Sequence, residues 1–401
     1  MIPWLGDSAK VIHVSKSGND NNGGVAQQYP VSLANDSKLT IGAAVTACPD
    51  GGTIIIWPGD YVEKVNLDAA DKAINLIGTN RMKCRILPSS GNAGIALEDG
   101  CTVQNLYVYS INQQAIIGTV KKNFTVSDCY LSNGGANALC FNYSDNVLIK
   151  RCYVFSKSMP IYAGNNTIIE DCFIIGDGTY TGIPNNPRLI SGIGDISTSL
   201  ILRNSLLLMQ PSYQKGTDLY QVSVAIKGIY GIGRVIIENC DILIDGSKPG
   251  GANPASYFDG DAYGIHNCDY VSIANSRIHT ITDQNKSKTA YSLYLKTKAQ
   301  LLNCSLTSAG QSASYDLYAS SARVAVLTGC NYDSSKVHSN VTVQSAMDPN
   351  GPLIQAAKSI VNKAVQNKIT GAIDYYDDDG QTIILTQTPT EAESTITRTP
   401  S

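Results

Sequence analysis

The sequence predicts an all-β protein built as a single-stranded parallel β-helix, and two observations support that fold. A short segment recurs at steps of 20 to 36 residues: an apolar residue, two others, a cysteine or other small residue, a spacer and another apolar residue. Apolar and polar residues alternate within each segment, and glycine, asparagine and aspartate cluster between segments. Alternation of apolar residues at every second position excludes a helical solenoid. It is typical of short strands in coils that stack at about 4.8 Å and share one core.

The recurrent small position is interpreted as packing rather than chemistry. None of the eleven cysteines lies closer to another than Cys129 does to Cys140, which excludes the C-x-x-C spacing of most zinc and redox sites. We therefore expect no metal or cofactor. The alternative to packing is that the cysteines form a disulfide framework. The aligned positions are Leu106, Cys129, Cys152, Cys172, Ser205, Cys240, Ser276, Cys304 and Cys330.

The residue before this position is often asparagine or aspartate, at Asp128, Asp171, Asn204, Asn239, Asn275 and Asn303. These side chains hydrogen-bond the local backbone and tolerate left-handed turns. We expect a ladder of them at one corner of the coil, with the small residues pointing into the core just beyond it.

The order of elements predicts three parts. Residues 1–39 are an N-terminal arm, and 40–345 form the β-helix. In "TIGAAVTAC", Ile41, Ala44, Val45 and Cys48 have helical spacing, which predicts a capping helix that ends before Pro49. Residues 346–401 are a small helix-hairpin module and tail: "GPLIQAAKSIVNKAVQ" has helical spacing, and "GAIDYYDDDGQTIILTQT" predicts a hairpin around Asp379 and Gly380.

Two segments resemble known families. Residues Thr40–Val65 resemble the opening of the pectin-lyase-like superfamily, most closely that of pectinesterases, which implies a right-handed parallel β-helix. The catalytic motifs of pectinesterases, pectate lyases and polygalacturonases do not occur, and we interpret Glu63 as a structural residue of the first turn. The last 50 or so residues, about 350–401, are similar to short C-terminal segments on structural proteins of tailed bacteriophages.

Composition excludes two classes of partner. Net charge is −3 and the lysines and arginines are scattered, so we expect no nucleic-acid binding. No apolar run approaches the roughly 20 residues of a membrane span, which predicts no membrane insertion. The opening "MIPWLGDSAK" has no basic region followed by an apolar one, so we expect no export signal in the chain as given.

Three consecutive long steps predict loops that cluster along one wall, where binding usually occurs on a rigid scaffold. Five side chains on and beside these loops are candidates for substrate binding: Tyr180, Arg188, Tyr213, Tyr220 and Tyr257. Asp259 and Asp261 are the candidate catalytic pair, because their spacing permits the carboxyl separation of about 5 to 9 Å in glycosidases. The alternative is that both are solvated turn formers beside Gly260.

Three late strands, "AYGIHNC", "AYSLYLK" and "SYDLYAS", add an aromatic stripe. We expect Tyr263, Tyr291 and Tyr315 on one face with Ile265, Leu293 and Leu317, and His266, Tyr294 and Tyr318 facing outward. His266 and Tyr294 are accordingly candidates for sugar binding. Contact with a neighbouring subunit or a loop is the alternative.

These features favour a bacteriophage virion appendage, tailspike or tail-fibre-like, that recognises host surface polysaccharide with or without cleaving it. The expected partners are the polysaccharide, other virion proteins and further copies in a homotrimer, at the virion surface after synthesis in the host cytoplasm. The alternatives are a secreted pectin-type polysaccharide lyase or hydrolase whose export signal has been removed, and a non-catalytic virion decoration or adaptor protein.

Overall fold

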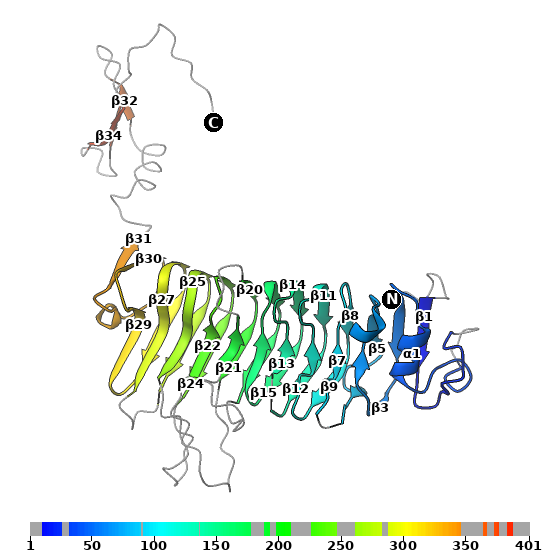
Figure 1. The fold of residues 1–401 in the computed structure, drawn as a ribbon. Helices are drawn as coiled ribbons and strands as arrows, with labels where there is room; N and C mark the ends of the chain where they lie inside the picture. Colours follow the sequence, from blue (N-terminus) through cyan, green and yellow to red (C-terminus); the bar gives the residue numbers. More distant parts are fainter. Residues whose placement is uncertain are drawn as a thin grey trace. The chain divides into compact units, whose positions relative to one another are not determined.

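A computed structural model describes residues 10–25, 32–89, 91–135, 137–177, 188–192, 198–209, 226–246, 261–282 and 288–345, with the backbone of three later strands. Figure 1 shows successive coils from β1 and α1 onward, and the fold is the predicted right-handed parallel β-helix. Within the described ranges the coils form one sheet of 21 strands and one of ten. None of the described helices is long and apolar enough to cross a membrane.

The ten-stranded sheet forms one face of the β-helix, with one strand from each coil. Its strands are β3 (Gly59–Tyr61), β6 (Cys84–Ile86), β9 (Tyr107–Ser110), β12 (Tyr130–Asn133), β15 (Tyr153–Ser156), β18 (Phe173–Gly176), β21 (Leu206–Met209), β24 (Asp241–Asp245), β26 (Arg277–Ile281) and β28 (Ser305–Ala309).

The 21-stranded sheet bends around the core and supplies two further faces. One row consists of β4 (Val65–Asn66), β7 (Ile95–Ala96), β10 (Ile116–Ile117), β13 (Asn137–Cys140), β16 (Met159–Tyr162), β19 (Arg188–Ser191), β22 (Ile226–Tyr230) and β29 (Ala313–Ala319). The other consists of β1 (Val11–Val14), β2 (Thr53–Ile56), β5 (Asn75–Gly78), β8 (Thr102–Gln104), β11 (Lys122–Ser127), β14 (Asp145–Lys150), β17 (Asn165–Glu170), β20 (Ser199–Arg203), β23 (Arg234–Glu238), β30 (Arg323–Thr328) and β31 (Val341–Ser345). The long strands β25 (Ala262–Ala274) and β27 (Thr289–Leu302) run through both rows.

The corner ladder and the small core position are confirmed. All six predicted asparagines and aspartates have φ between 48° and 56°. Successive amides are bonded from coil to coil, as in Asn239 Nδ2 to Asn204 Oδ1 at 3.2 Å. The small residues that follow them are buried from Leu106 to Cys304, Cys330 is half-buried, and none of the eleven cysteines, all within the described ranges, forms a disulfide.

The predicted capping helix is α1 (Ile41–Ala47), and both of its ends are held by charged side chains. Ile41, Ala44 and Val45 are buried against the first coils. The Glu63 carboxylate accepts hydrogen bonds from the backbone of Ile41 and Gly42 at 3.0 and 2.8 Å, which is the structural role expected for it. At the other end, Lys72 Nζ donates to the last carbonyls of the helix, including that of Cys48 at 2.7 Å.

Two further segments complete the description. In the predicted N-terminal arm, β1 pairs with β2 from Val11–Thr53 to Val14–Ile56, so the sheet begins before residue 40. Near the C-terminus, β32 (Ala364–Gln366), β33 (Ile373–Tyr376) and β34 (Ile383–Gln387) form an antiparallel sheet, which confirms the predicted hairpin. Residues 351–363 of the predicted helix lie outside the described residues, and its last three, Ala364–Gln366, form strand β32 instead, because they pair with β33. Short 3₁₀ turns occur at Asp68–Ala70 and Ser334–Lys336.

The core position predicts a stability difference between two substitutions of one cysteine. Cys240 is 2% exposed, and its thiol donates to the Glu238 carbonyl at 3.2 Å. Cys240→Leu should overpack this site and cost about 1–3 kcal/mol of unfolding free energy. Cys240→Ser should cost less than about 1 kcal/mol, because Ser205 and Ser276 make the equivalent bond at 2.7 Å. Denaturant unfolding of both variants checks this, and equal losses would contradict it.

Candidate functional site

A strip of cationic and aromatic side chains lies on the outer face of β16, β19, β22, β25, β27 and β29. Strand register arranges it in two columns that run from coil to coil. The first column is Arg188, Lys227, Tyr263, Tyr291 and Tyr315. The second column is Tyr162, Ser191, Tyr230, His266, Tyr294 and Tyr318. We call these eleven residues the strip.

The tyrosines of both columns face outward, which corrects the inward orientation expected for Tyr263, Tyr291 and Tyr315. Tyr263 is half-buried, whereas the next two residues, Gly264 and Ile265, are both buried. A Cβ on Gly264 would lie 2.5 Å from a methyl of Ile278, so glycine is required where the chain bends inward. Period two is therefore interrupted, and Tyr263 emerges on the same side as His266, with ring centroids 4.3 Å apart.

The aromatic rings of the strip stack mainly on one another. Tyr263 and Tyr291 are parallel with centroids 4.7 Å apart, and Tyr291 and Tyr315 follow at 5.7 Å. In the second column His266 meets Tyr294 edge-on at 4.6 Å. Because these ring faces cover each other, this part of the strip offers ring edges and hydroxyls to a ligand rather than a flat stacking surface.

The strip is cationic on the coils before the tyrosines. The Arg188 guanidinium lies 4.0 Å from the centroid of the Tyr230 ring, and Lys227 Nζ lies 4.2 Å from it. Arg188 also donates from Nη1 to the Ser191 hydroxyl at 3.0 Å. Lys227 is only 5% exposed. Two cations are thus held side by side against one aromatic ring, a contact that partly offsets their loss of hydration.

This cationic end lacks carboxylate partners among the described residues. No carboxylate in that part of the chain lies within ion-pair distance of Arg188 or Lys227. Arg188 Nε and His266 Nδ1 are both buried and have no hydrogen-bond partner there. Buried polar groups are usually satisfied, so these orphaned atoms mark a place where an external group can bind.

Burial sets the protonation states at this end. It lowers the pKa of Lys227 to about 8, with a further contribution from Arg188. It also lowers the pKa of His266 to about 3, assisted by Lys227 and Arg188. At neutral pH the site therefore presents two cations and a neutral imidazole, an environment that favours an anion.

Asp261 lies at the tyrosine end of the strip, where the structure gives it a supporting role. Its carboxylate accepts from the Thr289 backbone at 2.9 Å and from the Tyr263 hydroxyl at 3.3 Å. Its expected catalytic partner, Asp259, lies outside the described residues, so the pair stays a prediction. The expected binding residues Tyr180, Tyr213, Tyr220 and Tyr257 also lie outside them.

Of the remaining predicted site residues, Arg188, His266 and Tyr294 are brought together in the strip. Sequence reasoning missed Lys227, Tyr230 and Tyr162. The signal was present, because "KGIY" at 227–230 aligns with "YGIH" at 263–266 when the long insertion between them is removed. Among the described residues, no group of three or more His, Cys, Asp or Glu side chains is placed to hold a metal ion.

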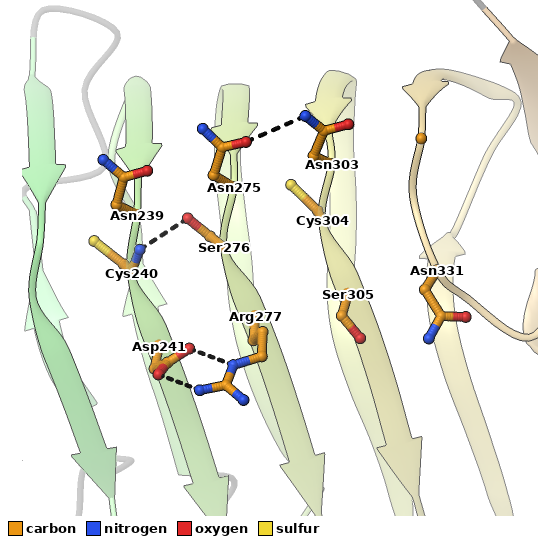
Figure 2. Close-up of a pocket in the computed structure, with 11 residues that line it drawn as sticks. Asn239, Cys240, Asp241, Asn275, Ser276, Arg277, Asn303, Cys304, Ser305 and Asn331 are labelled. Atoms are coloured by element: carbon orange, nitrogen blue, oxygen red, sulfur yellow. Dashed lines mark hydrogen bonds and ion pairs between the residues drawn. The ribbon is translucent and has the colours of Figure 1, made fainter.

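A hollow away from the strip follows the corner ladder over the late coils (Figure 2). Its polar groups largely bond one another: Asn303 donates to Asn275 at 3.3 Å, and Arg277 makes two bonds to Asp241 at 2.7 and 2.6 Å. These contacts hold neighbouring coils together. The hollow is therefore part of the scaffold rather than a second candidate site.

Comparisons with known proteins found matches among solved structures alone. No family model and no curated protein matches the chain. Similar solved structures include a pectate lyase at 13% identity, covering 89% of this chain and 86% of that one, with a TM-score of 0.44. A pectin methylesterase from carrot has 15% identity, coverages of 84% and 88%, and a TM-score of 0.40. The catalytic domain of a GH87 alpha-1,3-glucanase, in complex with nigerose, has 11% identity, coverages of 85% and 68%, and a TM-score of 0.39.

At these TM-scores the matches carry no argument, and the parallel β-helix is assigned from the pairing of the strands. That fold is the one implied by the resemblance of Thr40–Val65 to the pectin-lyase-like superfamily.

Proposed function

We propose that the chain binds an acidic polysaccharide along the strip, with a carboxylate or sulfate of the sugar held by Arg188 and Lys227. The observation that carries this proposal is a pair of cations, the buried Lys227 and the half-buried Arg188, at 4.2 and 4.0 Å from the Tyr230 ring, without a described carboxylate beside them. A buried cation without a partner is costly, and an anionic ligand removes that cost when it binds.

The tyrosines of the strip can bind the neutral hydroxyl groups of such a polymer. The Tyr263, Tyr291 and Tyr315 side chains recur on successive coils, about 4.8 Å apart, and their hydroxyls can donate to and accept from sugar hydroxyls. The neutral His266 ring contacts both Tyr230, on which the cations lie, and Tyr263, at centroid distances of 5.3 and 4.3 Å. A linear chain running from coil to coil would use both parts of the strip.

Cleavage requires more than this binding surface. Glycoside hydrolysis uses two carboxyl groups on either side of the scissile bond. Asp261 is beside the strip, and Asp259 is the residue we expect to supply the second carboxyl group. An enzyme of this kind would be a polysaccharide lyase or hydrolase, whereas binding alone fits a recognition or adaptor protein.

For the biological setting, we propose a tailed-bacteriophage virion appendage that recognises polysaccharide on the host surface. The similarity of the C-terminal segment to structural proteins of such phages supports this setting. A secreted pectin-type enzyme and a virion decoration protein remain the alternatives. The homotrimer and the contacts with other virion proteins rest on the resemblance alone.

The test is binding of the full chain to immobilised polysaccharides of matched length, acidic and neutral. We expect retention on acidic polymers, weakened by salt. Arg188→Gln should reduce retention at least tenfold, because it removes a charge-assisted bond. Lys298→Met, which removes one exposed positive charge elsewhere, is the matched control and should change it less than twofold. Equal retention on neutral polymers, or equal loss in both variants, contradicts the proposal.

A further inference from the structure

The outer face of the ten-stranded sheet carries an apolar region that the polysaccharide site does not use. In one register column the half-buried rings of Tyr107, Tyr130, Tyr153 and Phe173 follow one another at centroid distances of 4.9, 4.5 and 5.4 Å. Leu206 continues the column and is 40% exposed. The adjacent column is also largely apolar, with Tyr109, Ser132, Phe155, Ile175, Leu208 and Leu243. An exposed region of this kind marks an interaction surface.

Charged pairs border the aromatic column on both sides, in the same order along the chain. Before it, Arg85 makes two bonds to Asp60 at 2.6 and 2.5 Å. After it, Arg277 makes two bonds to Asp241 at 2.7 and 2.6 Å. The complete column is Asp60, Arg85, Tyr107, Tyr130, Tyr153, Phe173, Leu206, Asp241 and Arg277, and we call it the Tyr153 column.

When the Tyr153 column is read in the reverse direction, each acid of one copy lies opposite a base of the other. Tyr153 is the central residue, and positions equally far before and after it pair an acid with a base: Asp60 with Arg277, and Arg85 with Asp241. Between them, Tyr107 pairs with Leu206 and Tyr130 with Phe173. A two-fold axis that runs along β15, in the plane between two copies, would bring about these contacts.

We propose that this face binds a second copy of the chain in an antiparallel, two-fold pair centred on Tyr153. A parallel arrangement about an axis along the β-helix would instead place Arg85 near Arg85 and Asp241 near Asp241 of the other copies. The two-fold pair places opposite charges together at both ends and apolar side chains together in the middle, which is the pattern of an isologous interface.

The dimensions of the face are adequate for such a pair. Eight coil steps separate Asp60 from Arg277, which at about 4.8 Å per step gives a length of about 40 Å. The four-residue strands β9, β12, β15, β18 and β21 span about 13 Å at about 3.3 Å per residue, so the flat face measures about 500 Å². The relief of its side chains brings the accessible surface toward the roughly 800 Å² per partner of a standard interface. This inference goes beyond the proposed function, because the Tyr153 column lies on the ten-stranded sheet and the strip lies on the 21-stranded sheet. It holds whether or not the strip binds a sugar.

Spin labels at the centre and at one end of the column test the geometry. Light scattering of the full chain should first give twice the mass of one chain. A nitroxide at Tyr153→Cys should give an inter-copy distance below roughly 25 Å, because the two sites face each other across sheets about 10 Å apart. A nitroxide at Ser305→Cys, five coils from Tyr153, should give roughly 50 Å, because its copies lie ten coil steps apart.

Short distances at both positions would overturn the proposal in favour of a parallel assembly, including the homotrimer, and a monomeric mass would overturn it altogether. The parent chain treated with the same label controls for native cysteines, of which Cys140 and Cys330 are only half-buried. As a second variant, Tyr130→Glu should give a monomer with an unchanged circular-dichroism spectrum. Tyr143→Glu, at a 56% exposed residue outside this sheet, should leave the dimer intact.

Discussion

Replacing Lys227 by methionine should stabilise the protein and abolish its binding of acidic polysaccharide. Lys227 is 5% exposed and has no carboxylate partner among the described residues. An apolar side chain of similar length removes the cost of that buried charge, so the free energy of unfolding should rise by roughly 1–3 kcal/mol at neutral pH. Loss of a buried charge contact should weaken binding by about 2–4 kcal/mol, or roughly 30- to 1,000-fold. Calorimetry and denaturant unfolding measure both quantities.

The buried charge of Lys227 should also make the stability of the parent chain depend on pH. The pKa of Lys227 is about 8 in the folded chain and about 10.5 unfolded, so between these values the unfolded state binds more protons. Stability of the parent should therefore increase from pH 8 to pH 10.5 relative to Lys227→Met. Binding of the acidic polymer should weaken above pH 8, and Lys227→Arg, which stays charged, should remove that pH dependence. Destabilisation by Lys227→Met at neutral pH contradicts this account.

Truncation of the aromatic core should have the second large effect. Phe124 is 1% exposed, and its ring packs against that of the fully buried Phe141 at a centroid distance of 5.0 Å. Phe124→Ala would leave a cavity inside the stacked coils and should cost about 3–5 kcal/mol of unfolding free energy. Tyr143→Ala, at a 56% exposed position, is the control and should stay within about 0.5 kcal/mol of the parent. Similar losses in both variants would mean that Phe124 is not a core residue.

Most of the fold could be predicted because a parallel β-helix repeats its local chemistry. Asparagine and aspartate at the corner, such as Asn204 and Asn239, tolerate the positive φ that each coil requires, and the residue after them must be small. These constraints are local, so they are visible in the sequence. The start of the sheet was less visible, because β1 pairs with a strand that lies beyond the intervening helix.

The candidate site was harder to predict for two physical reasons. Alternation at period two placed Tyr263 with Ile265, but Gly264 and Ile265 both turn inward at a bend. A glycine inside a strand can mark such a bend, but the equivalent residues of the next two strands are Ser292 and Asp316, so the three strands share no common signal. Lys227 and Tyr230 lie between two long insertions, so their register with His266 becomes clear only when the strands are paired. Loop residues such as Asp259 lie outside the described residues, and their roles stay predictions.

The most direct test of the central claim compares one acidic oligosaccharide with its carboxyl-reduced, neutral form. Both ligands have the same length and linkages, so the difference between their dissociation constants isolates the contribution of the carboxylates. For the parent chain we expect the acidic form to bind at least 30-fold more tightly, and for Lys227→Met we expect that preference to fall below threefold. If the parent binds both forms equally, the pair of Arg188 and Lys227 is not an anion site.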